Sequence, residues 1–129
     1  MSTKALPDDV IRFLNDHIDS VEQLEVLLLL HRAADADWTA EMVAAALYTQ
    51  PASAARRLEA LHTDGLIERA PGREAYRFVV DPAHRDELIS AVADTYRERR
   101  VAVVTAIASK PMENVRAFSD AFRLRRKEE

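Results

Sequence analysis

Glycine is so scarce in this chain that the turns built on glycine are confined to one short stretch. The 129 residues include two glycines, Gly65 and Gly72, and glycine is the residue that most readily adopts the left-handed backbone of helix ends and tight turns. On both sides of residues 64–81 the apolar residues recur at helical spacing. We therefore expect a mainly α protein with a small β-hairpin at this one place.

Hydrophobic spacing and helix-end signals predict where the elements lie. Ser20 followed by Gln23 has the spacing of a capping box, and the helix it opens is apolar on most sides, which is typical of a central, buried helix. Alternating residues predict hairpin strands at 66–70 and 75–80. The helices are expected at about residues 7–18, from 20 to the polar break at 35–37, from 39 to about 48, and at 51–64, 82–108 and 112–122.

Composition excludes several classes of protein. Apolar residues make up 48% and charged residues 31% of the chain, a balance that a disordered chain lacks. The chain has no cysteine, so disulfides and thiol chemistry are excluded and a cytoplasmic location is expected. The longest apolar run covers residues 42–48, far short of the roughly 20 residues of a membrane span. We expect no secretory signal and no membrane partner.

No motif for catalysis or for a bound cofactor is visible. The sequence contains no phosphate-binding glycine loop and no nucleophile elbow. The four histidines stand 14, 31 and 22 residues apart, which is not the spacing of a metal site on one helix face. We expect no enzyme activity, no catalytic residue, no cofactor and no metal.

The order of the predicted elements points to a fold. A helix, a short helix, a tight turn, a second helix and a hairpin follow one another within residues 20–80, and two helices with a short turn between them form a helix-turn-helix. We expect a single domain over residues 1–129. Residues 20–80 are its core, and residues 81–129 are a C-terminal helical extension.

These residues resemble the winged helix-turn-helix of bacterial transcriptional regulators over about half of the chain. The resemblance is carried by TAEMVAAALYTQPASAARRLEALHTDGLIER, residues 39–69, and by the hairpin ending EAYRFV. With one helix before and two after, the topology looks like MarR-type regulators, with PadR-type regulators second. The resemblance implies a homodimer that reads double-stranded operator DNA with the second helix of the motif. It also implies a small-molecule pocket between the motif and the dimer helices.

The second helix of the motif, residues 51–64, has a surface suited to a DNA groove. At 100° per residue, one face is expected to pack on the core through Ala54, Ala55, Leu58, Leu61 and His62. The opposite face carries small residues around Arg56, which is able to pair with a guanine edge in the major groove. Base and phosphate contacts are expected from Thr49, Gln50, Ser53, Arg56, Arg57 and Thr63. The alternative for Arg56 is a surface ion pair with Glu59.

The hairpin and the charge balance complicate this interpretation. Arg73 at the hairpin tip is the candidate for a minor-groove or phosphate contact. Residues 21–80 hold six arginines and no lysine against nine carboxylates, a net charge of −3, whereas phosphate neutralisation supplies most non-specific DNA affinity. The alternative function is a winged-helix adaptor that binds a protein partner through the C-terminal helices and the acidic sides of the motif.

The C-terminal helices have apolar positions three, four or seven residues apart. In residues 82–108 they are Leu88, Val92, Tyr96, Val103 and Ile107, and the last helix adds Met112, Val115, Phe118 and Phe122. Such spacing is typical of helices packed along their length on others. We expect these helices to form the homodimer interface. The alternative is that they pack back onto the first two helices of the same chain.

Overall fold

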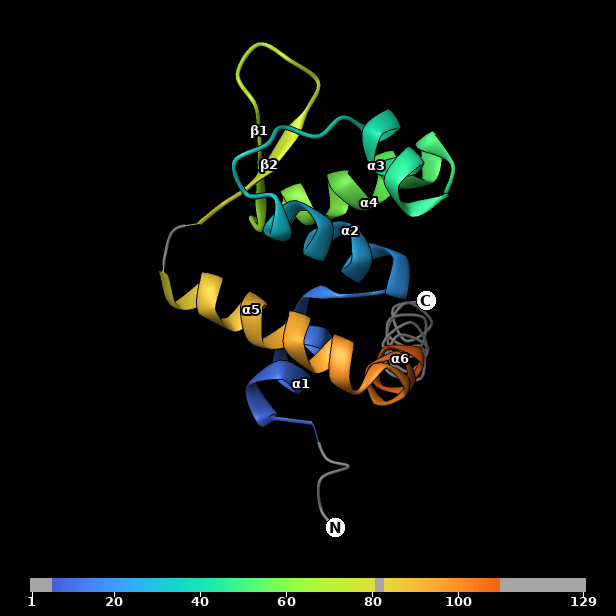
Figure 1. Cartoon of the computed structure of the whole chain (residues 1–129), viewed down its shortest axis with the longest axis vertical. Helices are drawn as coiled ribbons and strands as arrows, with labels where there is room; N and C mark the ends of the chain where they lie inside the picture. Colours follow the sequence, from blue (N-terminus) through green and yellow to red (C-terminus); the bar gives the residue numbers. More distant parts are fainter. Residues whose placement is uncertain (1–5, 81–82, 110–129) are drawn as a thin grey trace, which may run out of the picture.

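A computed structural model describes residues 6–80 and 83–109 of the chain. It is mainly helical with one small antiparallel hairpin, as predicted. The predicted helix at 112–122 lies outside the described residues. Within the described part, no helix is both long enough and apolar enough to cross a membrane. The elements are α1 (Asp8–His17), α2 (Val21–Arg32), α3 (Ala40–Leu47), α4 (Pro51–Thr63), β1 (Ile67–Arg69), β2 (Tyr76–Phe78), α5 (Ala83–Glu98) and α6 (Arg100–Ala108) (Figure 1).

Helix α2 is the centre of the molecule. It lies between α3, α4 and the hairpin on one side and α1 and α5 on the other (Figure 1). Residues 26–30 are all buried, which confirms that this helix is covered nearly all round. Its start is capped as the sequence predicted, since the Ser20 hydroxyl accepts from the Gln23 amide at 3.0 Å. The Gln23 side chain in turn accepts from the amide of Asp19 at 2.7 Å, one residue earlier than a standard capping box places it.

Helices α3 and α4 are joined by a short turn over residues 48–50. The Thr39 hydroxyl caps α3 by accepting from the Met42 amide at 3.1 Å. Tyr48 ends α3 in the left-handed conformation, with φ 58°, and Pro51 fills the first position of α4, where a missing amide hydrogen costs nothing. Gly65, with φ 80°, then turns the chain away from α4 toward the hairpin.

The hairpin is shorter than the sequence predicted. Its register pairs Ile67 with Phe78 and Arg69 with Tyr76. Residues 66, 70, 75, 79 and 80, which were expected in the strands, lie outside β1 and β2. Trp38 adds a bridge on the other side of β2, donating to the Tyr76 carbonyl at 2.7 Å and accepting from its amide at 2.8 Å. This bridge ties the hairpin to the start of α3.

The predicted long helix over 82–108 is wrong in one respect, because it is broken at Arg99. The backbone there leaves the helical region, with φ −134° and ψ 55°, and α6 runs in a different direction from α5 (Figure 1). The break is anchored on both sides, since Tyr96 before it and Arg100 after it both donate to Glu25 of α2. The break brings α6 against α1, and Val103 and Ile107 are buried there.

The left-handed position at Gly65 generates a prediction about stability. We expect Gly65→Ala to lower the free energy of unfolding by about 1 kcal/mol, because an L side chain is strained at this φ. A Cβ there meets nothing within 4 Å, so the cost comes from the backbone alone. Tyr48→Gly is the matched control, since it relieves the same strain at a side chain that is 96% exposed. Urea unfolding that shows Gly65→Ala as stable as wild type contradicts this reading.

Candidate nucleic-acid interface

The outer face of α4 is open and lined mostly by small residues. Ala54, Leu58 and Leu61 are buried beneath it, as predicted. Ala55 was expected on the core face, and this is wrong, because it is exposed. Ser53 was expected on the outer face, but it is half-buried and faces α2. The exposed residues of the face are Ala52, Ala55, Arg56, Glu59, Ala60 and Thr63.

Arg56 stands on this face without an ion-pair partner among the described residues. The predicted alternative, a pair between Arg56 and Glu59, is not formed. Glu59 instead accepts a hydrogen bond from the Tyr76 hydroxyl at 3.1 Å and lies 3.5 Å from an Arg69 nitrogen. The Glu59 carboxylate therefore binds hairpin residues, and the Arg56 guanidinium stays available to a ligand.

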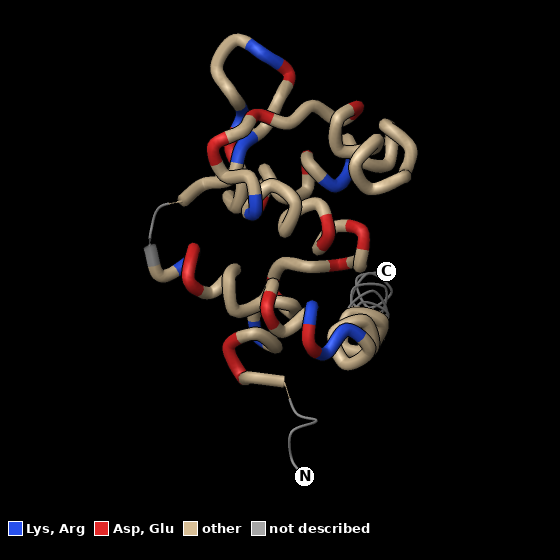
Figure 2. The backbone as a smooth tube through the Cα atoms, viewed as in Figure 1, with Lys and Arg blue, Asp and Glu red and all other residues tan. Residues whose placement is uncertain are grey.

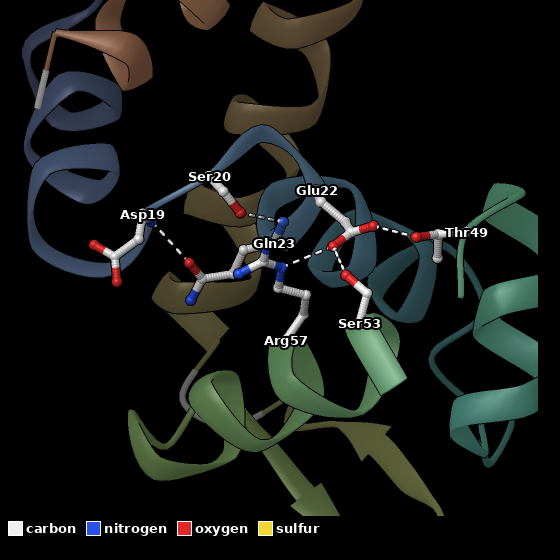
Figure 3. Close-up of polar contacts among 7 residues, drawn as sticks. All are labelled: Asp19, Ser20, Glu22, Gln23, Thr49, Ser53 and Arg57. Atoms are coloured by element: carbon white, nitrogen blue, oxygen red, sulfur yellow. Dashed lines mark hydrogen bonds and ion pairs between the residues drawn. The ribbon is translucent and has the colours of Figure 1, made fainter. Parts of the chain in front are cut away.

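Three of the predicted contact residues converge on one carboxylate instead of facing solvent. Glu22, in the first turn of α2, accepts from the Thr49 hydroxyl at 2.5 Å, the Ser53 hydroxyl at 2.5 Å and Arg57 Nε at 2.8 Å (Figure 3). We call these four residues the Glu22 cluster. The side chains of Arg57 and Glu22 are 31% and 25% exposed. The cluster joins α2 to the turn and to the first half of α4.

The Glu22 cluster holds its carboxylate in the charged form. Hydrogen bonds from Ser53 and then Thr49, assisted by Arg57, lower the pKa of Glu22 from 4.5 to about 2, although burial opposes them. Each donor favours the ionised carboxylate, because only that form accepts all three bonds. The positive charge of Arg57 is therefore already neutralised within the protein.

The arginines of the hairpin are paired as well, but loosely. Arg73 at the tip is 58% exposed and lies 3.8 Å from Asp37. Arg77 Nε lies 3.0 Å from the other oxygen of Asp37, and Arg69 approaches Glu59. Exposed ion pairs of this kind contribute about 0.2–1 kcal/mol. Arg69 and Arg73 can therefore exchange a carboxylate for another anion at small cost, whereas Arg77 is held closely by Asp37, whose side chain is 22% exposed.

The predicted contact residues thus fall into two groups. Gln50, Arg56, Thr63 and Arg73 are exposed, whereas Thr49, Ser53 and Arg57 are half-buried in the Glu22 cluster. Sequence reasoning missed Glu22, because it is 27–35 residues away from its partners and no local pattern marks such a contact. Figure 2 shows the resulting distribution, in which acidic and basic residues are mixed over the whole backbone.

A groove of about 670 Å³ lies on another side of the molecule, between α2, the end of α3 and the α5–α6 break. Its wall includes Glu25, which accepts from the Tyr96 hydroxyl at 2.8 Å and from Arg100 at 3.2 Å. Burial, and then the bond to Glu25, raise the pKa of Tyr96 to about 12. Tyr48, His31 and Arg97 also line the groove. Its size suits a small molecule.

Comparisons of the chain with protein-family models, with curated proteins and with solved structures found no match. Function is therefore inferred from the chain's own geometry. Two features stand out: the open face of α4 with Arg56, and the Glu22 cluster at its flank.

The Glu22 cluster predicts a measurable loss of stability. Glu22→Ala leaves two hydroxyls and a guanidinium without their acceptor, so we expect the free energy of unfolding to fall by about 1–3 kcal/mol. Glu87→Ala is the matched control, because Glu87 is an exposed helix carboxylate with no partner among the described residues. Chemical denaturation at pH 7 measures both variants. Equal stability of Glu22→Ala and wild type contradicts the assignment.

The sign of the pH dependence follows from the lowered pKa of Glu22. The folded-state pKa is about 2 against 4.5 in the unfolded chain, so the cluster stabilises the fold fully above pH 4.5. This contribution is lost progressively as the pH falls from 4.5 through 2. Glu22→Ala is expected to show a shallower loss of stability over this range than wild type, and Glu87→Ala the same loss as wild type.

Proposed function

We propose that residues 20–80 form a winged helix-turn-helix and that the protein is a DNA-binding transcriptional regulator, similar to MarR-type proteins. The fold proposal is supported by the short turn between α3 and α4 and by the hairpin that directly follows α4. The bridge from Trp38 to Tyr76 supports it further, because it fixes the hairpin beside the motif as a wing.

The observation that carries the function is the outer face of α4. The major groove, about 12 Å wide, admits an α-helix with an exposed outer face. Here Arg56 lies among alanines, with Glu59 on the same face, and its guanidinium is exposed and has no ion-pair partner in the described part of the chain. A bidentate contact between this guanidinium and a guanine would supply sequence recognition.

The remaining contacts go to the DNA backbone. Gln50 at the start of α4 and Thr63 at its end are exposed and flank the groove-facing surface. Arg73 at the wing tip exchanges its loose pair with Asp37 for a phosphate. Contacts of this type position the motif without reading the sequence.

The protein acts as a homodimer through its C-terminal helices. The buried side of α5 and α6 packs on α1 and α2 of the same chain, which is the alternative that the sequence left open. The outer side of α6 leaves Val101 78% exposed, and residues 101–109 include no charged side chain. An exposed apolar face of this kind favours a partner. A dimer presents two copies of α4 to successive major grooves.

One observation favours the second candidate function, a protein-binding adaptor. Of the six arginines in residues 21–80, four are paired with carboxylates: Arg57, Arg69, Arg73 and Arg77. Little positive charge is then left to attract phosphates. A titration of the protein with duplex DNA distinguishes the regulator from the adaptor.

The DNA proposal predicts a specific role for Arg56. Duplexes from the region upstream of the gene are expected to bind the wild-type protein, and Arg56→Ala is expected to weaken binding by about 1–3 kcal/mol, the value of a lost bidentate base contact. Fluorescence anisotropy at two salt concentrations measures it.

Arg12→Ala is the matched control for Arg56→Ala. Arg12 is an exposed arginine of α1, a helix that lies on the opposite side of α2 from α4 (Figure 1), and its removal subtracts the same charge. We expect the affinity of Arg12→Ala to stay close to that of wild type. Folded wild-type protein that binds none of these duplexes, even at low salt, rejects the DNA function and favours the adaptor.

The dimer proposal predicts the effect of a charge on α6. Val101→Asp places a carboxylate on the apolar face, so we expect the protein to shift from dimer to monomer in sedimentation experiments. Ala45→Glu adds the same charge at an exposed position of α3 and is expected to leave the dimer intact. A wild-type protein that is monomeric at all concentrations, or a Val101→Asp variant that remains dimeric, contradicts the proposed interface.

A further inference from the structure

The Glu22 cluster has the composition of a phosphate-binding site that is already occupied. Two hydroxyls and one guanidinium, from Thr49, Ser53 and Arg57, point at a single negative group (Figure 3). Hydroxyl and guanidinium donors of this kind make the phosphate contacts of DNA-binding proteins. In this chain the carboxylate of Glu22 takes the place of the phosphate.

We propose that Glu22 withholds Thr49, Ser53 and Arg57 from the DNA backbone, so that the protein binds non-specific DNA weakly and depends on base contacts from α4. This inference rests on the proposed DNA function. Glu22 is then a residue that determines DNA specificity. Its three partners, which the sequence predicts as DNA contacts, are held away from the DNA.

The position of Glu22 keeps its carboxylate bound to Thr49, Ser53 and Arg57. It lies in the first turn of α2, where the helix dipole stabilises a negative charge. It accepts three hydrogen bonds at 2.5, 2.5 and 2.8 Å, and its side chain is 25% exposed. A phosphate that approached Arg57 would have to break these bonds and come close to a half-buried negative charge.

The ion pairs of Arg69 and Arg73 in the hairpin are longer and more exposed than the pair between Arg57 and Glu22. The Arg73 pair spans 3.8 Å, and its arginine is 58% exposed. The Arg69 pair spans 3.5 Å, with both side chains more than half exposed. Such pairs open at small cost. DNA can therefore recruit Arg69 and Arg73 but not Arg57, which leaves Arg56 as the main determinant of affinity on α4.

The test uses Glu22→Gln, which keeps the shape of the side chain and removes its charge. We expect a mixed-sequence duplex to bind this variant about five- to tenfold more tightly at low salt, because one more phosphate contact becomes available. The slope of log K against log salt is expected to steepen by about 0.9. Adding Arg57→Ala to Glu22→Gln is expected to restore both values to those of wild type.

Glu87→Gln is the matched control. It removes the same charge from an exposed position of α5 that has no partner among the described residues. We expect its DNA affinity and salt slope to equal those of wild type. A gain in affinity as large as that of Glu22→Gln would mean that overall charge, and not the Glu22 cluster, sets the affinity, which overturns the inference.

Arg57→Ala in the otherwise wild-type protein tests the inference even if Glu22→Gln does not fold. We expect its salt slope to equal that of wild type, because Arg57 makes no phosphate contact, with affinity lowered only by repulsion from the Glu22 carboxylate that loses its partner. A loss of tenfold or more with a shallower salt slope shows that Arg57 contacts phosphate in the complex and overturns the inference, while the proposed function stands. If the wild type, Glu22→Gln and Arg57→Ala all fail to bind DNA, the proposed function fails and the inference with it.

Discussion

The burial of α2 on all sides is the constraint on which the other elements depend. Its apolar residues, including residues 26–30, fill the space between the α3–α4 side and the α1–α5 side of the molecule. The polar residues of the same helix then fix the neighbours. Glu22 binds the turn and α4, Glu25 binds both sides of the α5–α6 break, and His31 lies 2.9 Å from Asp86 of α5. The hydrophobic effect places these elements around α2, and the polar contacts set their register.

This arrangement decides what α4 presents to solvent. Packing through Ala54, Leu58 and Leu61 holds the helix against the core, and Glu22 holds its flank. The face that remains carries Arg56 among alanines. The charge distribution weakens the case for DNA binding, because most arginines near this surface already have carboxylate partners. In the DNA complex that we propose, such a protein gains little from phosphates and obtains its affinity mainly from base recognition.

The sequence predicts the parts of the fold that depend on local signals. The buried helix α2, the caps at Ser20 and Thr39 and the left-handed turn at Gly65 follow from composition and spacing. Contacts between residues that are far apart in the sequence do not follow from such local signals. Nothing near Glu22 marks its bonds to Thr49, Ser53 and Arg57, so these residues were expected to be free for DNA. The sequence also does not indicate the break at Arg99, because no glycine or proline marks it and the contacts of Tyr96 and Arg100 with Glu25 on its two sides join distant residues.

The central claim is that the outer face of α4 and the hairpin tip meet DNA. Backbone amide NMR shifts, recorded as a duplex from the upstream region is added, test it most directly because they report each residue separately. We expect the largest shifts at residues 50–63 and 71–74, with small shifts at residues lining the groove beside Tyr96. Shifts concentrated at α5, α6 and that groove, with α4 unaffected, would contradict the account.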